Sequence, residues 1–249
     1  MSYQLTGALD GISDVSVILP TYREAENIAN LVDEIETLPL GTSILVIDDS
    51  SPEKTAHVVK NLQKKYRNIL LCVRPEKRGL GTAITGGFKI FLSLKFPPKF
   101  IMTLDTDYSH SPKTIPMLLS KKRADCRIVM GSRYCKGGEV AGWSWATKVI
   151  SRTVNLLARF LIGLKLHDCT SGFRCYSTKF IRAAIGSLHS YTFEIQIETL
   201  RQALYRNFII KETPILSVNR KRGNSKLSLT EIQSYISYIF IAMLHGRRP

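Results

Sequence analysis

The first 104 residues alternate four short apolar runs with segments in which apolar side chains recur every three to four positions. The runs are predicted to be buried strands, and the segments between them helices that pack on the resulting sheet. Such alternation indicates an α/β domain with a mostly parallel central sheet and right-handed crossovers. The predicted strands span residues 15–19, 44–47, 69–73 and 100–104, and the first two predicted helices span residues 24–38 and 53–66.

Polar residues follow three of the predicted strands. All strands of a parallel sheet point the same way, so the loops after them share one edge, where open α/β sheets bind ligands. We therefore expect one site to be built from three segments that lie far apart in the sequence: Pro20-Thr21-Tyr22, Asp48-Asp49 and Asp105-Thr106-Asp107.

The pair Asp105 and Asp107 directly follows the apolar run 100–104. Side chains two positions apart lie on the same side of an extended chain. Two carboxylates suit Mg²⁺ or Mn²⁺, which takes further ligands from substrate phosphates. An Asp-x-Asp tripeptide is also common in turns and on surfaces, but the buried run in front of it favours a metal site.

Glycine recurs in segment 79–87, which is expected to lead into a helix. The segment lacks the Lys-Ser/Thr pair of a phosphate-binding loop and the full dinucleotide fingerprint. We interpret its glycines as allowing a tight turn and close packing, with direct phosphate binding as the alternative.

The charge of the chain is unevenly distributed around a formal net charge of +15. Residues 1–60 contain 3 basic and 10 acidic side chains, whereas residues 121–182 contain 13 basic and 3 acidic ones. The basic half predicts an anionic partner. A pI of about 9.7 would also suit a nucleic-acid-binding protein, but alternating basic and aromatic residues are missing. We therefore expect anionic lipid headgroups and phosphate substrates, and no nucleic acid.

The cysteines and the apolar stretches indicate in which cellular compartment the protein works. The five cysteines form no Cys-x-x-Cys pair, so neither a zinc site nor a disulfide framework is indicated and a reducing compartment is expected. The first 20 residues show no signal peptide. No apolar stretch reaches the roughly 20 residues of a membrane-spanning helix.

Two apolar helices are predicted in the second half of the chain. Residues 145–164 are expected to pack on the core, with membrane contact as the lesser alternative. Residues 229–244 carry an apolar stripe and are expected either to lie in a membrane interface or to cover the core. The basic loop 220–226 is either a solvated charge run or a clamp for phosphates.

We divide the chain into a flexible lead-in (1–14), an α/β domain (15–227) and a C-terminal amphipathic helix (228–249).

Eight motifs occur in a fixed order: Pro20-Thr21-Tyr22-x-Glu24, Asp48-Asp49-x-Ser51-Pro52, Arg78-Gly79-Leu80-Gly81, Asp105-x-Asp107-x-Ser109-His110-x-Pro112, Gly131-Ser132-Arg133-Tyr134, Asp168-Cys169-Thr170-Ser171-Gly172-Phe173-Arg174, Gln196-x-Glu198, and Arg220 with Ser225-Lys226-Leu227. Each is weak alone. The ordered set resembles the family 2 glycosyltransferases with a GT-A type, Rossmann-like fold, and within them the dolichol-phosphate (polyprenol-phosphate) mannose synthases.

The resemblance implies roles for the matching residues. Pro20, Tyr22, Glu24 and Asp49 would form the nucleotide pocket, and Asp105 and Asp107 would hold Mg²⁺ or Mn²⁺ with the diphosphate, with Ser109 as a further metal ligand. Arg133 and Arg174 would bind phosphate at the sugar or the acceptor, and Arg220 with Lys226 would close over the donor diphosphate. The chain departs from the family pattern at Arg23, Ser50, Lys54, Ile195 and Asn219, and none of these departures removes a required charge.

The reaction that the resemblance implies is the inverting transfer of mannose from GDP-mannose to a dolichyl or other polyprenyl phosphate. A phosphate monoester, with a second pKa near 6, is largely a dianion at neutral pH, so the acceptor needs little help from a general base. The alternatives are a UDP-glucose or UDP-N-acetylglucosamine donor, and a catalytically silent membrane-bound relative. The expected location is the cytoplasmic side of a membrane surface, directly or through a membrane-anchoring subunit.

Overall fold

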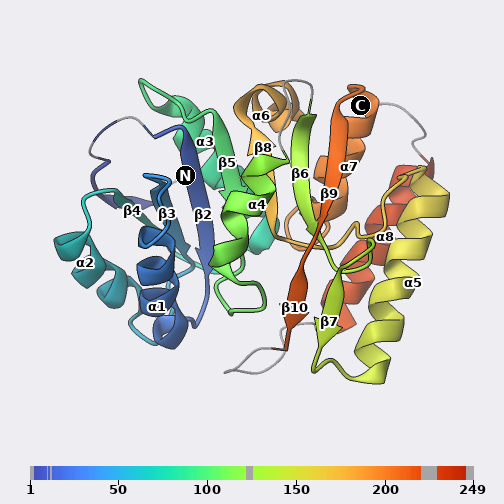
Figure 1. Cartoon of the computed structure of the whole chain (residues 1–249), viewed down its shortest axis with the longest axis horizontal. Helices are drawn as coiled ribbons and strands as arrows, with labels where there is room; N and C mark the ends of the chain where they lie inside the picture. The colour runs from blue at the N-terminus through green and yellow to red at the C-terminus, as the bar shows by residue number, and fades with distance from the viewer. Residues whose placement is uncertain (1–2, 10, 12, 122–125, 220–228, 245–249) are drawn as a thin grey trace.

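An eight-stranded sheet runs through the middle of the computed structural model, which describes residues 3–9, 11, 13–121, 126–219 and 229–244 (Figure 1). The strand order is β1-β4-β3-β2-β5-β8-β6-β9, and a separate pair, β7 and β10, forms a small parallel sheet. The strands are β1 (Gln4–Gly7), β2 (Val15–Thr21), β3 (Ser43–Asp48), β4 (Ile69–Val73), β5 (Phe100–Thr103), β6 (Cys126–Ser132), β7 (Glu139–Ala141), β8 (Arg174–Ser177), β9 (Ile209–Pro214) and β10 (Leu216–Val218).

Helices cover both faces of the sheet, and each face has its own apolar core. One core contains buried residues of α1, α2 and α4, and the other contains buried residues of α3 and α5 to α8. Strands β2 and β3 read as continuous apolar runs because their side chains are buried on both faces. The helices are α1 (Ala25–Glu36), α2 (Thr55–Lys65), α3 (Leu80–Ser93), α4 (Ile115–Ser120), α5 (Trp145–Ile162), α6 (Thr178–Ala184), α7 (Ile195–Tyr205) and α8 (Leu229–Leu244).

The predicted mostly parallel sheet is confirmed. Strand β2 pairs in parallel with both β3 and β5, and β6 pairs in parallel with β9. Two strands run the other way: β1 is antiparallel to β4, and β8 is antiparallel to both β5 and β6.

One local prediction differs from the structure. The lead-in 1–14 is not without structure, because residues 4–7 of β1 pair with residues 70–73 of β4. Strands β9 and β10 are separated at Ile215, whose N–H donates to the Ser132 carbonyl (3.1 Å) while its carbonyl accepts from the Glu139 N–H (3.0 Å). The chain passes there from the large sheet to the small one.

Helices α5 and α8 lie side by side at one end of the sheet (Figure 1). Tyr235 and Ile239 of α8 are buried in the same core as Val154 and Ala158 of α5. The apolar residues 240, 241, 243 and 244 of α8 are exposed, and the amphipathic character of this helix stays a prediction. Among the described helices, none has the length and apolar content to cross a bilayer.

Candidate active site

The carboxyl ends of the central strands are joined by hydrogen bonds. The Asp49 N–H, just after β3, donates to the Thr21 carbonyl of β2 (3.2 Å). The Thr106 hydroxyl, just after β5, donates to the Pro20 carbonyl (3.1 Å). The predicted convergence of these distant segments at one sheet edge is therefore confirmed.

A tight turn after β5 presents the acidic pair. The Ser109 N–H donates to Asp107 Oδ1 (3.0 Å), and Tyr108 between them has a left-handed φ of 59°, which is uncommon outside glycine. The Tyr108 hydroxyl donates to Glu34 Oε1 of α1 (3.2 Å), which holds the turn against the body of the domain. Asp105, Asp107 and Ser109 consequently line one cavity.

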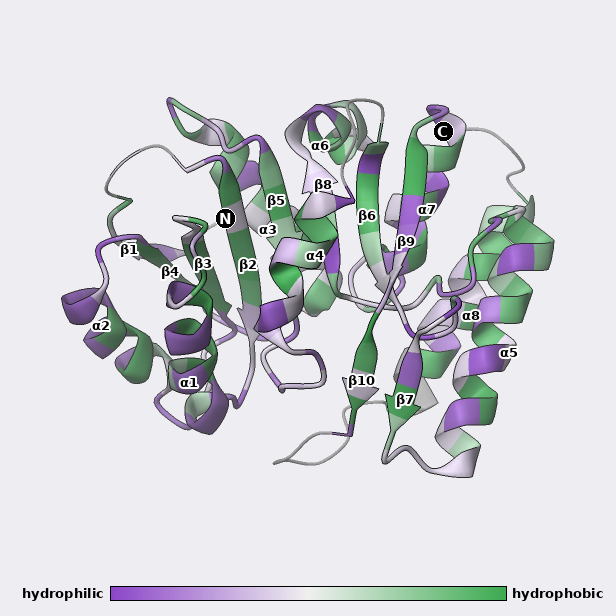
Figure 2. Cartoon of the chain, viewed as in Figure 1, coloured by the Kyte–Doolittle hydropathy of each residue, from purple (hydrophilic) through white to green (hydrophobic). Residues whose placement is uncertain are grey.

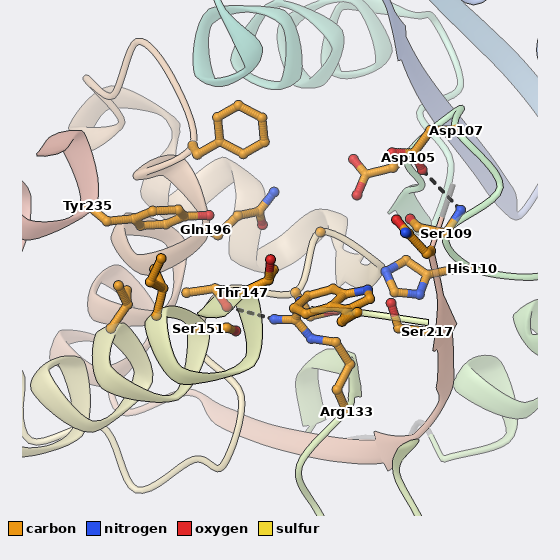
Figure 3. Close-up of a pocket in the computed structure, with 18 of the residues that line it drawn as sticks. Asp105, Asp107, Ser109, His110, Arg133, Thr147, Ser151, Gln196, Ser217 and Tyr235 are labelled. Carbon is orange, nitrogen blue, oxygen red and sulfur yellow. Dashed lines mark hydrogen bonds between the residues drawn. The ribbon is translucent and has the colours of Figure 1, made fainter. Parts of the chain in front are cut away.

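This cavity has a volume of about 340 Å³ and lies between the sheet edge and helices α5 and α8 (Figure 3). Asp105, Asp107 and His110 occupy one end, and Arg133 lies below them. The two helices contribute apolar and aromatic side chains, Ile150, Val154, Ile232 and Tyr235, and the hydroxyl groups of Thr147 and Ser151. Tyr235 lies away from the acidic pair (Figure 3). The cavity therefore suits a molecule that is polar and anionic at one end and apolar at the other.

Four buried polar atoms that line the cavity have no hydrogen-bond partner in the described part of the chain. They are His110 Nδ1, Ser171 Oγ, Gln196 Oε1 and Ser217 Oγ. Buried polar groups are nearly always hydrogen-bonded, and an unsatisfied one costs about 1–3 kcal/mol. Four such atoms around one cavity indicate a ligand with several hydroxyl or phosphate oxygens.

His110 is a neutral member of this group. Burial, assisted by the nearby positive charge of Arg133, lowers the pKa of His110 to about 4. Its ring stacks on Phe173 with 5.8 Å between the centroids. The imidazole is therefore fixed in place and uncharged at neutral pH, able to donate or accept one hydrogen bond with a ligand.

Asp105 is packed against the backbone of the loop before β8. A Cβ added at Gly172 would lie 2.9 Å from Asp105 Oδ2 and 3.2 Å from Oδ1. The Gly172 carbonyl accepts from the Thr103 hydroxyl (2.7 Å), so the loop itself is held to β5. Glycine at this position leaves room for the carboxylate.

Replacing Gly172 with alanine should lower kcat/KM by about 10- to 100-fold, because the methyl group displaces the Asp105 carboxylate and small misplacements of a functional group have effects of this size. The fold should persist, since a side-chain end can move aside. The matched control is Gly186→Ala, where a Cβ meets nothing within 4 Å. Wild-type turnover by the Gly172 variant would show that the position of Asp105 is unimportant.

Arg133 is held by a buried carboxylate. Its Nε and one terminal nitrogen donate to Asp168 Oδ2 and Oδ1, both at 2.7 Å, and its backbone N–H donates to Oδ2 (2.9 Å). Burial opposes the ionisation of Asp168, but the Arg133 guanidinium outweighs it and lowers the pKa of Asp168. The guanidinium also lies 5.4 Å and 5.2 Å from the ring centroids of Tyr134 and Trp143. Arg133 thus presents a fixed cation to the cavity.

Arg174 does not line the cavity, although the sequence predicts an anion-binding role. Its side chain has 0% exposure, and its guanidinium donates to the carbonyls of Cys169, Ser171 and Gln196. It joins the 168–174 loop to α7 beneath the cavity. The structure therefore supports a positioning role for Arg174 and not the predicted contact with phosphate, because its guanidinium is buried and each of its three nitrogens already donates within the protein.

The residues predicted to bind the nucleotide lie at the neighbouring strand ends, outside the lining of the cavity. Asp49 is buried and forms a 2.5 Å ion pair with Arg74. Lys77 lies over the Tyr22 ring, 4.5 Å from its centroid. Pro20 ends the same strand, and buried Glu24 accepts from the Asn27 amide (2.8 Å) at the start of α1. Arg220 and Lys226 lie outside the described residues.

The glycine-rich segment has the packing role that the sequence favours. A Cβ at Gly81 would lie 2.4 Å from the Ser190 carbonyl oxygen and 2.9 Å from that of Thr192. The Gly81 N–H also donates to the Tyr191 carbonyl (3.0 Å). Only glycine allows this close approach of the two backbones.

The acidic pair fits a divalent cation whose other ligands come from the substrate. Three or more His, Cys, Asp or Glu side chains do not cluster as a metal site within the described residues. Two carboxylates on one cavity wall are nevertheless what Mg²⁺ or Mn²⁺ requires when phosphate oxygens and water complete its coordination. The Ser109 hydroxyl adjoins them in the same cavity.

Sequence reasoning assigned no role to several cavity residues. Thr147 and Ser151 of α5, Tyr235 of α8 and Trp143, just before α5, line the cavity. The predictions for the two helices, core packing or membrane contact, gave these side chains no part in the site. His110 and Gln196 were within the recognised motifs, and their polarity amid buried neighbours was the available signal.

Residues 16–184 match Glycosyl transferase family 2. The chain belongs to this family and is a glycosyltransferase with the GT-A fold. It is 33% identical over 233 residues to the polyprenol monophosphomannose synthase of Mycolicibacterium smegmatis, covering 93% of this chain and 87% of that protein. It is 31% identical to the dolichol-phosphate mannosyltransferase of Pyrococcus furiosus, covering 92% of this chain and 63% of that longer protein.

Two solved structures share the fold at low sequence identity. Glucosyl-3-phosphoglycerate synthase from Mycobacterium tuberculosis, in complex with UDP, aligns with a TM-score of 0.64 at 16% identity, over 94% of this chain and 79% of that one. Mannosyltransferase PcManGT from Pyrobaculum calidifontis, in complex with GDP-Man and Mn²⁺, aligns with a TM-score of 0.60 at 12% identity, over 98% and 67%. The likeness establishes the fold of the catalytic domain.

Proposed function

We propose that this glycosyltransferase transfers mannose from GDP-mannose to a dolichyl or other polyprenyl phosphate with inversion at the anomeric carbon. The observation that carries the proposal is the two-ended cavity, with Asp105 and Asp107 at its polar end and an apolar wall between α5 and α8 at the other. The diphosphate of a nucleotide sugar would bind at the polar end. A lipid-linked phosphate would place its phosphate at the polar end and its lipid chain against the apolar wall. The names of the two relatives, at 31% and 33% identity, agree with this substrate pair.

In the proposed complex, Asp105 and Asp107, with Ser109 beside them, would hold Mg²⁺ or Mn²⁺. The bound cation would stabilise the negative charge of the departing nucleotide. Pro20, Tyr22, Glu24 and Asp49 hold the nucleotide at the ends of β2 and β3, and Arg220 and Lys226 close over the diphosphate.

The remaining cavity residues orient the sugar and the acceptor. His110, Gln196 and Ser217 supply the unsatisfied polar atoms that a mannose with several hydroxyl groups can use. Arg133 offers its fixed charge to a phosphate. An acceptor phosphate oxygen then forms the new bond to the anomeric carbon as the bond to the GDP oxygen breaks. No proton needs removal, because the acceptor is a dianion.

The acceptor is proposed to reach the cavity from a membrane surface at the α5 and α8 end of the molecule. Trp145 and Phe160 of α5 are 80% and 78% exposed, and Ile241 and Leu244 of α8 are also exposed. Figure 2 shows hydrophobic residues among hydrophilic ones along α5, and exposed apolar side chains beside basic ones suit contact with a headgroup surface. The membrane would be met on its cytoplasmic side, with or without an anchoring subunit.

The test is transfer from radiolabelled GDP-mannose to a detergent-solubilised polyprenyl phosphate with Mg²⁺, with Mn²⁺ and with EDTA. Lipid-linked mannose should form in the presence of a divalent metal and fall to background with EDTA. UDP-glucose and UDP-N-acetylglucosamine are run in parallel. Transfer from a UDP-sugar alone would overturn the GDP-mannose donor while keeping the acceptor, and no transfer from any donor would overturn the proposed activity.

A further inference from the structure

A second cavity, of about 380 Å³, adjoins Arg133 and helix α5. Residues of α5 and of the segments that precede and follow it form the cavity, and Arg133 lines both cavities. Its polar lining is strongly basic: Arg133, Arg152, Arg159 and His167, with Tyr134 and Asn155 between them. Within the part of the chain that the structure describes, no carboxylate lines this cavity.

Arg152 and Arg159 supply the cations that remain available in this cavity. They lie seven positions apart, so they project from the same face of α5, and both are exposed. Arg152 lies 6.0 Å from the Tyr134 ring centroid. Within the described residues, neither arginine forms an ion pair.

The nearby carboxylates are occupied. Asp168 is bonded to Arg133, and Glu212 accepts from the backbone N–H groups of His167 and Asp168 and lies 2.8 Å from His167 Nδ1. Two uncompensated guanidinium groups at one cavity therefore remain for an external anion. Guanidinium groups suit a phosphate group, because each can donate two parallel hydrogen bonds to its oxygens.

We propose that the Arg152–Arg159 cavity binds a phosphate group that takes no part in sugar transfer. The exposed Trp145, Leu156 and Phe160 lie on the same helix, which favours the headgroup of an anionic phospholipid as its source. That preference rests on the proposed membrane contact. A free phosphate would have the same chemistry. A phospholipid held here would fix the orientation of α5 on the membrane, with the acceptor entrance beside it.

The experiment measures binding of the full chain to sedimenting vesicles of phosphatidylcholine alone and of phosphatidylcholine with 30% phosphatidylglycerol, a composition chosen as roughly that of an anionic leaflet. The variants are Arg152→Gln/Arg159→Gln and Arg152→Lys/Arg159→Lys. The glutamine pair should bind the anionic vesicles roughly 25-fold more weakly, because each cation near an anionic surface contributes about fivefold. The lysine pair should lose at least about fivefold, because lysine keeps the charge without the bidentate geometry.

The matched control is Arg67→Gln/Arg182→Gln, which removes two exposed arginines remote from α5 and should bind within about twofold of wild type. Calorimetric titration with inorganic phosphate, without vesicles, separates the two sources. Phosphate binding that is lost in both variants, with vesicle binding unchanged, supports a free phosphate as the ligand.

Wild-type binding by the glutamine pair in both assays would overturn the site. The site would also be overturned if the lysine pair bound vesicles as the wild type does and no protein bound inorganic phosphate. Vesicle binding would then come from diffuse charge attraction. Transfer to a short-chain, water-soluble polyprenyl phosphate is measured alongside and should be the same in all variants. If the wild type transfers no mannose, the proposed function fails while the binding assays still decide the site.

Discussion

Replacing Asp107 with asparagine should reduce sugar transfer by at least about 1,000-fold and leave the fold intact. The substitution removes one of the two carboxylates proposed to hold the divalent cation, whose stabilisation of the leaving diphosphate contributes several kcal/mol to such reactions. Asparagine keeps the oxygen that accepts the Ser109 N–H (3.0 Å), so the turn after β5 should persist. Turnover at saturating Mn²⁺ and binding of Mn²⁺ in the presence of GDP should both fall.

The control is Asp14→Asn, which removes an exposed carboxylate that pairs with Lys99 (2.8 Å) away from the site. This variant should keep wild-type turnover. Substantial metal-dependent transfer by the Asp107 variant would remove Asp107 from the mechanism, whatever the role of Asp105.

Replacing Asp168 with asparagine should lower the free energy of unfolding by about 3–5 kcal/mol, because it leaves the buried Arg133 guanidinium without its counter-charge. The amide would also turn a donor toward an arginine that now makes two 2.7 Å bonds to the carboxylate. For a chain of this size the melting temperature should fall by roughly 10 °C. Calorimetry and urea unfolding measure the effect.

The double variant Asp168→Asn/Arg133→Met serves as the comparison, and it should recover part of the lost stability because no unpaired buried charge remains.

The pH dependence of the stability that Asp168 contributes has a defined sign. Folding lowers the pKa of Asp168, so its contribution is complete above the unfolded value of about 3.9 and is lost as the pH falls through the lower folded value. A loss below about 1 kcal/mol in the single variant at pH 7 would contradict this account.

Much of the site could be predicted because its parts follow strands that the sequence marks clearly. Asp49 and Asp105 stand directly after apolar runs, and parallel topology alone places such residues at one edge. The hydrogen bond from Thr106 to Pro20 shows how directly this rule acts. The same reasoning failed for Arg174, because its hydrogen-bond partners lie on a loop and on α7, and no local pattern specifies contacts at that separation.

The sequence by itself determined the class of fold, the position of the acidic pair and the helix that became α5, because apolar periodicity and turn residues act over a few positions. Only the tertiary structure decided that Arg133 would be fixed by Asp168, that Arg174 would lie beneath the cavity and that β1 would join the sheet. It also decided that α8 would pack beside α5 and close the apolar end of the cavity. These outcomes depend on which surfaces meet when the chain is compact, and burial and charge compensation between distant residues are set only there.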